Sequence, residues 1–359
     1  MFTFKTFVVL VAALGAATAK PAKRCEPTGS TDPTPTDPST DPTSTGPPAP
    51  PETPPPSGGG SQGEYSQTAN IVGEGWYDAW EWWANEDPTH GRVQYVDLDT
   101  TRQLNLTSVE GDRFIIRADT SQGSLDPNGP GRRAVRIQTK EAYTKFTSVL
   151  DVRHMPAGRG SWPAYWTCGE NWPYGGELDI IEGVNNGDRN LMSLHTGPDC
   201  RMPDSRDMSG EPANPDCNCE NGANGNQGCN TVDVNTASFG PNFNAKEGGW
   251  YVVERSDTTI KIWFWNRDDP NVPADVKSNT GAVSPSTWGR PVALFVSDQC
   301  DIGSKFGPNK FIINTTFCGD WAGNAFQPGG MGGCIDFVNN NPDEYKDAYW
   351  DINRMSIYQ

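Results

Sequence analysis

Short apolar runs recur along most of the chain after about residue 68. Residues 113–117, 134–138, 147–152, 250–254 and 259–265 are rich in β-branched and aromatic side chains. Clusters of Gly, Pro, Asn and Asp separate these runs, and no long stretch repeats apolar residues at helical spacing. Short strands between turn residues are typical of all-β proteins. The pattern therefore predicts an antiparallel sandwich or barrel, in one large domain or two smaller ones.

The first 64 residues have a different pattern. Lys5 precedes an apolar run at 7–17, and Ala17-Thr18-Ala19 offers a small-x-small cleavage site. Such a segment is typical of a secretory signal peptide and is too short to span a bilayer. Residues 26–63 consist almost entirely of Pro, Thr, Ser, Asp and Gly, which favours an extended linker. We expect a leader at 1–19, a linker at 20–64 and a folded domain at 65–359.

The rest of the chain agrees with export. No later segment is long and apolar enough to span a membrane, and residues 356–359 do not form a lipid-anchor tail. We therefore expect a soluble, extracellular protein. In an oxidising compartment, cysteines are best interpreted as disulfides. The expected domain holds an even set, whose pairing the sequence leaves open: Cys168, Cys200, Cys217, Cys219, Cys229, Cys300, Cys318 and Cys334.

Two features of the cysteine pattern need separate interpretation. Bridges from this set are expected to pin the long loop at about 198–231, which has little else to order it. Cys217, Cys219 and Cys229 resemble a metal knuckle, but the signal peptide favours disulfides instead. Cys25, in the linker, is the odd one out: it is free, pairs with another chain, or is removed by processing.

Three carboxylates lie within six residues, in Glu177-Leu178-Asp179-Ile180-Ile181-Glu182. The intervening residues are those of a buried strand. Because side chains alternate along a strand, Glu177 and Asp179 share one face whereas Glu182 points to the other. One extra residue at Ile180-Ile181, a β-bulge, brings all three acids to one face and lets both isoleucines pack behind.

Two carboxylates that flank one bond are the equipment of glycoside hydrolysis, in which one acid protonates the leaving oxygen and the other is nucleophile or base. Asp179, between the two, is placed to share a proton with a neighbouring Glu and so to hold their titrations apart. The alternative for such a charge run is a cation-binding strand or a solvated edge.

Aromatic residues crowd the stretch before the acids. They lie in Gly160-Ser161-Trp162-Pro163-Ala164-Tyr165-Trp166 and in Glu170-Asn171-Trp172-Pro173-Tyr174-Gly175-Gly176. Aromatic rings stack on the apolar faces of pyranose sugars, so rings next to paired acids favour a polysaccharide cleft. Core packing accounts for about half of the 13 Trp, because Trp is highly buried on average.

These motifs resemble glycoside hydrolase family 16, in particular the fungal laminarinase-like endo-1,3(4)-β-glucanases. The resemblance rests on Gly-x-Trp-Pro-Ala-x-Trp, on Asn-Trp-Pro and on Gly-Glu-Leu-Asp-Ile-Ile-Glu-Gly-Val-Asn. It extends from about residue 68 to the C-terminus through similar opening and closing segments: 76–78, 87–91, 93–97, 194–197, 300–303 and 317–323.

The resemblance implies a curved β-jelly roll whose concave face carries the substrate cleft. It assigns Glu177 as nucleophile, Asp179 as assisting acid and Glu182 as general acid/base of a retaining double displacement. It also implies substrate-binding roles for Trp166, Trp172, His195 and Trp321. His90 and His154 are expected to be structural or surface residues. Three scattered His argue against a catalytic zinc site, and we expect no metal and no cofactor.

The net charge of the chain argues against nucleic acids and anionic membranes as partners. The formal charge is -17, so nothing on this chain neutralises the phosphates of nucleic acids or anionic membranes. A neutral β-glucan is indifferent to that charge, and we expect a monomer. Asn105 and Asn314 begin N-glycosylation sequons, the first in an expected turn and the second in a possible strand.

The sequence thus predicts a secreted, retaining endo-β-glucanase acting on β-1,3 and mixed β-1,3/1,4 glucans. A glucan transglycosylase would carry the same acids, because transfer and hydrolysis share one covalent intermediate. A non-catalytic glucan-binding protein would keep the aromatic cleft but typically lose the acids. The preferred linkage depends on subsite shape at several loops and stays open.

Overall fold

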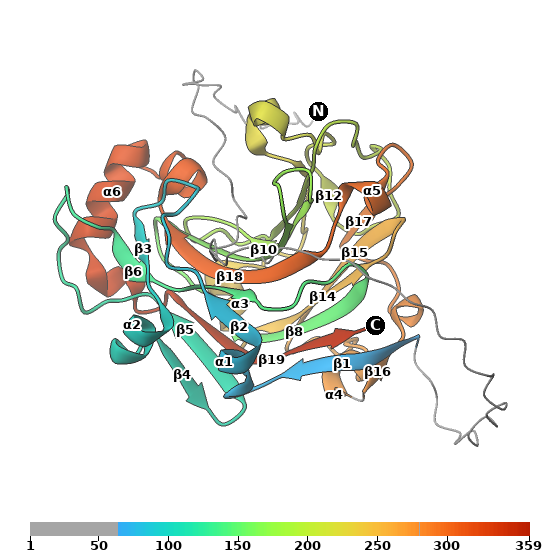
Figure 1. Cartoon of the computed structure of the whole chain (residues 1–359), viewed down its shortest axis with the longest axis horizontal. Coiled ribbons are helices and arrows are strands. Elements are labelled where there is room, and N and C mark those ends of the chain that lie inside the picture. The colour runs from blue at the N-terminus through green and yellow to red at the C-terminus, as the bar shows by residue number, and fades with distance from the viewer. Residues whose placement is uncertain (1–63, 280) are drawn as a thin grey trace, which may run out of the picture.

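Two curved antiparallel sheets, packed face to face, make up most of the structure (Figure 1). It is a computed structural model and describes residues 64–279 and 281–359. The expected leader, nearly all of the expected linker and Cys25 therefore lie outside the described residues. The architecture confirms the predicted curved, all-β sandwich.

The inner sheet contains the strand with the three acids. Its order is β12-β13-β11-β10-β9-β18-β7-β2, and all the pairs are antiparallel. In that order the strands are Glu211–Pro212, Cys229–Val232, Leu191–His195, Glu177–Glu182, Ser161–Gly169, Asn309–Phe317, Arg136–Thr139 and Trp80–Trp82. β9 and β18 are the longest of these, and β10 lies beside β9.

The outer sheet follows the order β16-β1-β19-β8-β14-β15-β17, and β5 and β4 extend it from β19. In that order these nine strands are Ala282–Val283, Tyr65–Ile71, Tyr349–Tyr358, Phe146–His154, Gly249–Arg255, Thr259–Asn266, Ala293–Val296, Arg113–Arg117 and Thr107–Glu110. In Figure 1, β8, β19 and β1 of this sheet lie below β10 and β18.

Four of the five predicted strands are confirmed as β5, β8, β14 and β15. The fifth, at 134–138, was expected to be continuous and is instead two strands. β6 (Arg132–Ala134) pairs in parallel with β3 (Val93–Tyr95), and β7 begins two residues later and pairs with β18. The chain switches at Val135 from pairing with β3 to pairing with β18. This switch interrupts the strand, although the residues on both sides of Val135 favour extended backbone.

Helices are short, with one exception. They are α1 (Gly75–Ala79), α2 (Leu98–Gln103), α3 (Gly240–Ala245), α4 (Ala274–Ser278), α5 (Ile302–Lys305) and α6 (Gly330–Asn340), with 3-10 turns η1 (Glu220–Asn226), η2 (Pro285–Thr287) and η4 (Pro342–Tyr345) and a π turn η3 (Gly319–Gly323). None of these helices is long and apolar enough to cross a membrane.

The longest helix, α6, was not predicted, because three of its first four residues are Gly and favour no helix. Tertiary contacts supply what propensity lacks. Cys334 is tied to Cys318 by a disulfide, and Val338 packs in one cluster with Phe317 and Tyr345. A Cβ at Gly333 would lie 2.6 Å from the Pro328 carbonyl oxygen, so this close approach requires glycine.

The main core lies between the two sheets. Alternate residues of the inner strands, such as Tyr165 and Ile313, meet Leu150, Tyr251 and Ile262 of the outer strands. The other face of the inner strands is then free to carry polar and aromatic side chains, because successive side chains of a strand point to opposite faces. Trp76, Trp80 and Trp350 are fully buried in this core and are packing residues, as expected for part of the Trp complement.

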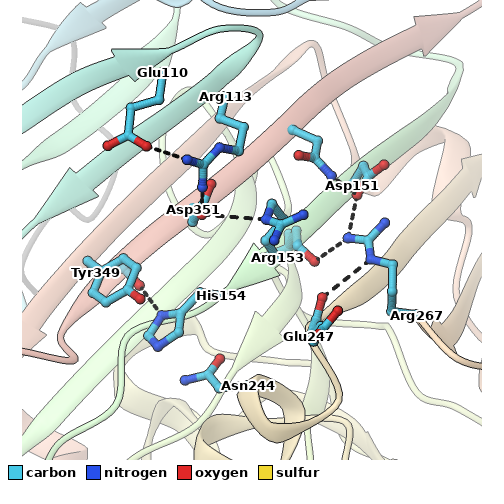
Figure 2. Close-up of polar contacts among 12 residues, drawn as sticks. Glu110, Arg113, Asp151, Arg153, His154, Asn244, Glu247, Arg267, Tyr349 and Asp351 are labelled. Carbon is cyan, nitrogen blue, oxygen red and sulfur yellow. Dashed lines mark hydrogen bonds and ion pairs between the residues drawn. The ribbon is translucent and has the colours of Figure 1, made fainter.

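Charged side chains form a network across the strands of the outer sheet (Figure 2). Arg113 on β5 contacts Glu110 and lies 2.6 Å from Asp351 on β19. Asp151 on β8 accepts from Arg267 at 2.6 Å. Both aspartates are buried, so each guanidinium compensates a carboxylate that has lost most of its water.

Disulfides account for most of the domain's cysteines. The structure has the bridges Cys200–Cys300, Cys217–Cys229 and Cys318–Cys334, and Cys168 is disulfide-bonded as well. The first two bridges pin the loop between β11 and β13, as predicted. The expectation that the whole even set pairs is wrong, because Cys219 is a buried free thiol. The bridge between Cys217 and Cys229 leaves no metal knuckle.

A buried carboxylate beyond β13 has a consequence for stability. Asp233 accepts a hydrogen bond from the Asn235 amide at 2.9 Å, whereas its Oδ2 atom has no partner. Burial is the main cause that raises the pKa of Asp233 to about 6. Asp233 therefore stays protonated to a higher pH in the folded state than in the unfolded state, where an Asp has a pKa of about 3.9. The contribution of Asp233 to folding becomes less favourable as pH rises from about 4 to 6.

We expect Asp233→Asn to stabilise the protein at neutral pH. The amide keeps the oxygen that accepts from Asn235 and removes the charge, so the free energy of unfolding should rise by about 2–3 kcal/mol at pH 7.5 and hardly change at pH 4. Urea unfolding at both pH values measures this difference. Asp207→Asn, at an exposed position, is the matched control. An equal effect of Asp233→Asn at both pH values would contradict the proposed buried charge.

Candidate active site

The catalytic candidates lie on β10, and the predicted bulge is present in that strand. Against β9, Asp179 pairs with Trp166 and Ile181 pairs with Tyr165, so Ile180 is an extra residue without a register partner. The register resumes with Glu182 opposite Ala164. The shift lies within the residues where the sequence requires it.

The bulge sorts the six side chains of β10 into two sets. Leu178, Ile180 and Ile181 are fully buried in the core between the sheets. The three acids line one pocket on the other face, so both isoleucines pack behind them as predicted. The remaining lining residues are Asp87, Thr89, Arg136, Trp162, Ala164, Trp166, Asn314 and Thr316.

Asn190, just before β11, satisfies the backbone of the bulge. Its Nδ2 atom donates to the Ile180 carbonyl at 2.7 Å, and its Oδ1 atom accepts from the Glu182 amide at 2.9 Å. A bulge removes such groups from the ladder, and a buried backbone group without a partner is costly. Asn190 is itself fully buried. Its side chain therefore holds Glu182 in place, a role that sequence reasoning missed.

Glu182 has a neutral polar neighbour. The indole Nε1 of Trp162 donates to Glu182 Oε1 at 2.8 Å. Trp321, in η3, packs edge-on against Trp162 with ring centroids 5.7 Å apart. Trp321 is half-buried and outside the pocket lining, so the structure places it next to the site through Trp162.

Glu177 and Asp179 have a cationic neighbour. His195 on β11 is the direct cross-strand partner of Glu177, and its Nε2 atom lies 3.7 Å from Glu177 Oε1 and 2.9 Å from Asp179 Oδ2. Burial alone lowers the pKa of His195, but the charges of Glu177 and Asp179 outweigh it and raise that pKa well above its ordinary value. The ring is therefore an imidazolium that favours ionised carboxylates beside it.

Glu177, Asp179 and His195 also have potential metal-ligand atoms within 4.8 Å of one another. Within residues 64–279 and 281–359, this is the group with that geometry. A metal ligand must be a neutral imidazole, whereas the charges of the two carboxylates raise the pKa of His195. The geometry therefore fits an ion-paired trio better than a cation site.

Trp166, predicted as a sugar platform, lines the pocket and is held by Asn314. Its Nε1 atom donates to Asn314 Oδ1 at 2.8 Å, and Asn314 Nδ2 donates to the Tyr95 hydroxyl at 3.2 Å. Asn314 is buried on β18 and takes part in the pocket, so its sequon does not present an accessible amide. Asn105, by contrast, lies exposed in a turn, as predicted.

Trp172, His90 and His154 are not among the residues that line the pocket. Trp172 is half-buried and packs against the cluster of Ala164, Trp166, Cys168 and Ile312. His90 is exposed and contacts Asp320, while His154 stacks on Tyr349 with ring centroids 3.8 Å apart. Figure 2 shows His154 beside Tyr349, among the polar residues of the outer sheet. Both histidines have the structural or surface places that the sequence predicted.

Two charged lining residues were missed by sequence reasoning. Asp87 fixes the loop that follows β2 by accepting from Thr316 Oγ1 at 2.5 Å and from the Gly91 amide at 3.1 Å. Arg136, in the first position of β7, lies between the rings of Trp83 and Trp166, with Cζ 4.6 and 5.1 Å from their centroids. The available signal was an Arg in the predicted strand at 134–138.

A curved antiparallel sandwich with paired carboxylates on a bulged strand of its inner sheet defines a β-sandwich glycoside hydrolase. The model of the XgeA-like, catalytic GH16 domain matches residues 80–358. The chain belongs to glycoside hydrolase family 16.

Individual relatives agree with this family. A probable endo-1,3(4)-β-glucanase of Aspergillus clavatus is 39% identical over 305 residues, covering 82% of this chain and 46% of that protein. Laminarinase 16A from Phanerochaete chrysosporium, solved with 6-O-glucosyl-laminaritriose in donor and acceptor sites, is 47% identical with a TM-score of 0.79, covering 82% of this chain and 99% of that one. An elongating β-1,3-glucosyltransferase of the family is 34% identical with a TM-score of 0.77, covering 82% and 100%. The chain spans about half the length of most of the curated relatives it matches.

Proposed function

We propose that this chain is a secreted endo-β-glucanase that hydrolyses β-1,3 and mixed β-1,3/1,4 glucans with retention of configuration. The observation that carries the proposal is the bulge at Ile180, which brings Glu177, Asp179 and Glu182 to one pocket. The Trp166 and Trp162 rings in the same lining supply apolar surface for sugar faces.

The two glutamates have environments suited to different roles. Glu177 lies beside the His195 imidazolium, which favours the ionised form that a nucleophile needs. Glu182 accepts a hydrogen bond from the Trp162 indole, a neutral donor that adds no positive charge to favour the ionised form. Asp179 sits between them on the strand and pairs with His195. This difference in environment supports Glu177 as nucleophile and Glu182 as general acid/base.

In the first step, Glu177 attacks the anomeric carbon while Glu182 gives its proton to the leaving glycosidic oxygen. The products are a covalent glycosyl–enzyme ester on Glu177 and a shortened glucan with a free hydroxyl. In the second step, Glu182 takes a proton from water, the resulting oxygen attacks the anomeric carbon, and Glu177 leaves as a carboxylate. Two inversions retain the configuration.

A glucan transglycosylase is the second candidate, and the similarity to the elongating β-1,3-glucosyltransferase favours it specifically. In that case a sugar hydroxyl replaces water in the second step, so products longer than the starting oligosaccharide accumulate. A non-catalytic glucan-binding protein is disfavoured, because all three acids line the pocket.

The first test is to incubate the purified protein with laminarin, lichenan and chitin and to follow product size over time. We expect shorter oligomers from laminarin and lichenan and none from chitin. Longer products would establish transfer, and unchanged polymer in every case would contradict an enzyme. Recovery of the protein from the culture medium of its host would test secretion, and retention inside the cell would contradict it.

A further inference from the structure

Cys219 is the free thiol of the described domain, and it lies directly behind the candidate acids. Its Sγ atom is 3.3 Å from Nδ1 of His195, whose Nε2 atom faces Asp179 and Glu177. All four side chains are more than nine-tenths buried. Neither Cys219 nor His195 is among the residues that line the pocket, and the carboxylates of Glu177 and Asp179 lie between the imidazole and that lining.

The backbone around Cys219 is built to hold this contact. The Cys219 amide donates to the Thr196 carbonyl at 2.9 Å, and Thr196 in turn donates to Cys217 at 2.9 Å. The Cys217–Cys229 bridge ties the ends of this loop to β13. On that side Gly228 leaves the space that the imidazole occupies, since a Cβ there would lie 3.0 Å from Nδ1.

The groups that face the imidazole are few. β10 contributes the carboxylates of Glu177 and Asp179, and the loop contributes the Cys219 thiol. Gly228, just before β13, and the disulfide-bonded Cys229 at its start carry no charge. Nδ1 therefore depends on sulfur for its hydrogen bond, and Nε2 depends on the carboxylates.

We propose that Cys219 is a positioning residue that keeps a proton on Nε2 of His195, directed at Asp179 and Glu177. When the ring is charged, Nδ1–H donates to sulfur; when it is neutral, the thiol donates to Nδ1 and the remaining ring proton stays on Nε2. In both forms a positive hydrogen faces the carboxylates. The inference rests on the proposed hydrolase function, in which Glu177 must be ionised.

Removing the Cys219 sulfur should first change the protonation of the His195 ring. In Cys219→Ala, a charged ring leaves a buried Nδ1–H without an acceptor, so the imidazolium is disfavoured. His195 then becomes neutral at lower pH, and Glu177 loses the cation that favours its ionised form. Cys219→Ser keeps a group that both donates and accepts, so it should restore the wild-type behaviour.

The experiment is ¹⁵N NMR of histidine-labelled wild type, Cys219→Ser and Cys219→Ala. The chain has three histidines, and the variants His90→Gln and His154→Gln assign the other two. In wild type we expect Nε2 to keep its proton when the ring becomes neutral. A neutral ring protonated on Nδ1 overturns the proposal without any variant, and so does a Cys219→Ala spectrum that titrates like wild type.

Enzyme kinetics give a second readout that a merely structural role would not move. We expect the alkaline limb of the kcat/KM–pH profile, where His195 loses its charge, to shift downward by about 0.5–1 pH unit in Cys219→Ala, with KM little changed, and to stay in place in Cys219→Ser. Superimposable profiles for all three proteins contradict the proposal. If wild type cleaves no glucan, the proposed function fails, while the NMR titration still decides the role of Cys219.

Discussion

Glu177→Gln is expected to abolish glucan hydrolysis, with kcat on laminarin reduced at least about 10³-fold. The amide keeps the size of the side chain and its place on β10 but cannot form the glycosyl–enzyme ester. His195 keeps Asp179, 2.9 Å from its Nε2 atom, as a carboxylate partner in this variant, so the fold should be retained. Initial rates of reducing-end release measure the loss, and circular dichroism checks the fold.

Glu182→Gln is the matched control that separates the two roles. Laminarin needs a protonated leaving oxygen, so this variant should lose activity as well, by about 10²–10⁴-fold. An aryl β-laminaribioside with a good leaving group needs no such proton, so Glu182→Gln should still release its phenol whereas Glu177→Gln should not. The opposite pattern would show that the nucleophile and the acid have been exchanged.

Removing the Cys200–Cys300 bridge by Cys200→Ser and Cys300→Ser is expected to produce a large loss of stability. The two cysteines are 100 residues apart in the chain. A closure of that length limits the unfolded ensemble strongly, so the free energy of unfolding should fall by about 3–5 kcal/mol. The midpoint of urea unfolding under non-reducing conditions measures the change.

The Cys217–Cys229 bridge provides the comparison, because it spans only 12 residues. Its removal should lower the free energy of unfolding by about 1–2 kcal/mol less than removal of the long closure, if the effect is mainly on the unfolded chain. A larger loss from the short bridge would mean that the loop between β11 and β13 depends on it for native packing.

Much of the fold was predictable because the strands of the outer sheet carry their own signal. β8, β14 and β15 are apolar, β-branched and bounded by turn residues. The helix α6 and the interruption at Val135 were not predictable, because neither follows from local preference. The first depends on a disulfide and a tight contact at Gly333, and the second depends on which strand lies alongside.

The candidate site shows the same division. The bulge could be predicted from the alternation of side chains along a strand. Acids at positions one, three and six of a strand lie on one face only if the strand contains one extra residue. The partners of those acids did not follow, because Asn190, Trp162 and Cys219 are brought to them by other strands and loops. The even number of cysteines in the domain also led to a wrong prediction, because an even number does not exclude a free thiol.

All three acids belong to six consecutive residues of one bulged strand. The distances between these acids are therefore set by the local backbone geometry of β10 and not by the packing of segments that are distant in the sequence. As long as Asn190 still bonds the bulge, other loops around the pocket can lengthen, shorten or exchange side chains without altering that spacing. Choice of glucan and bond-breaking chemistry are thus separable properties of this scaffold, free to diverge independently among its relatives.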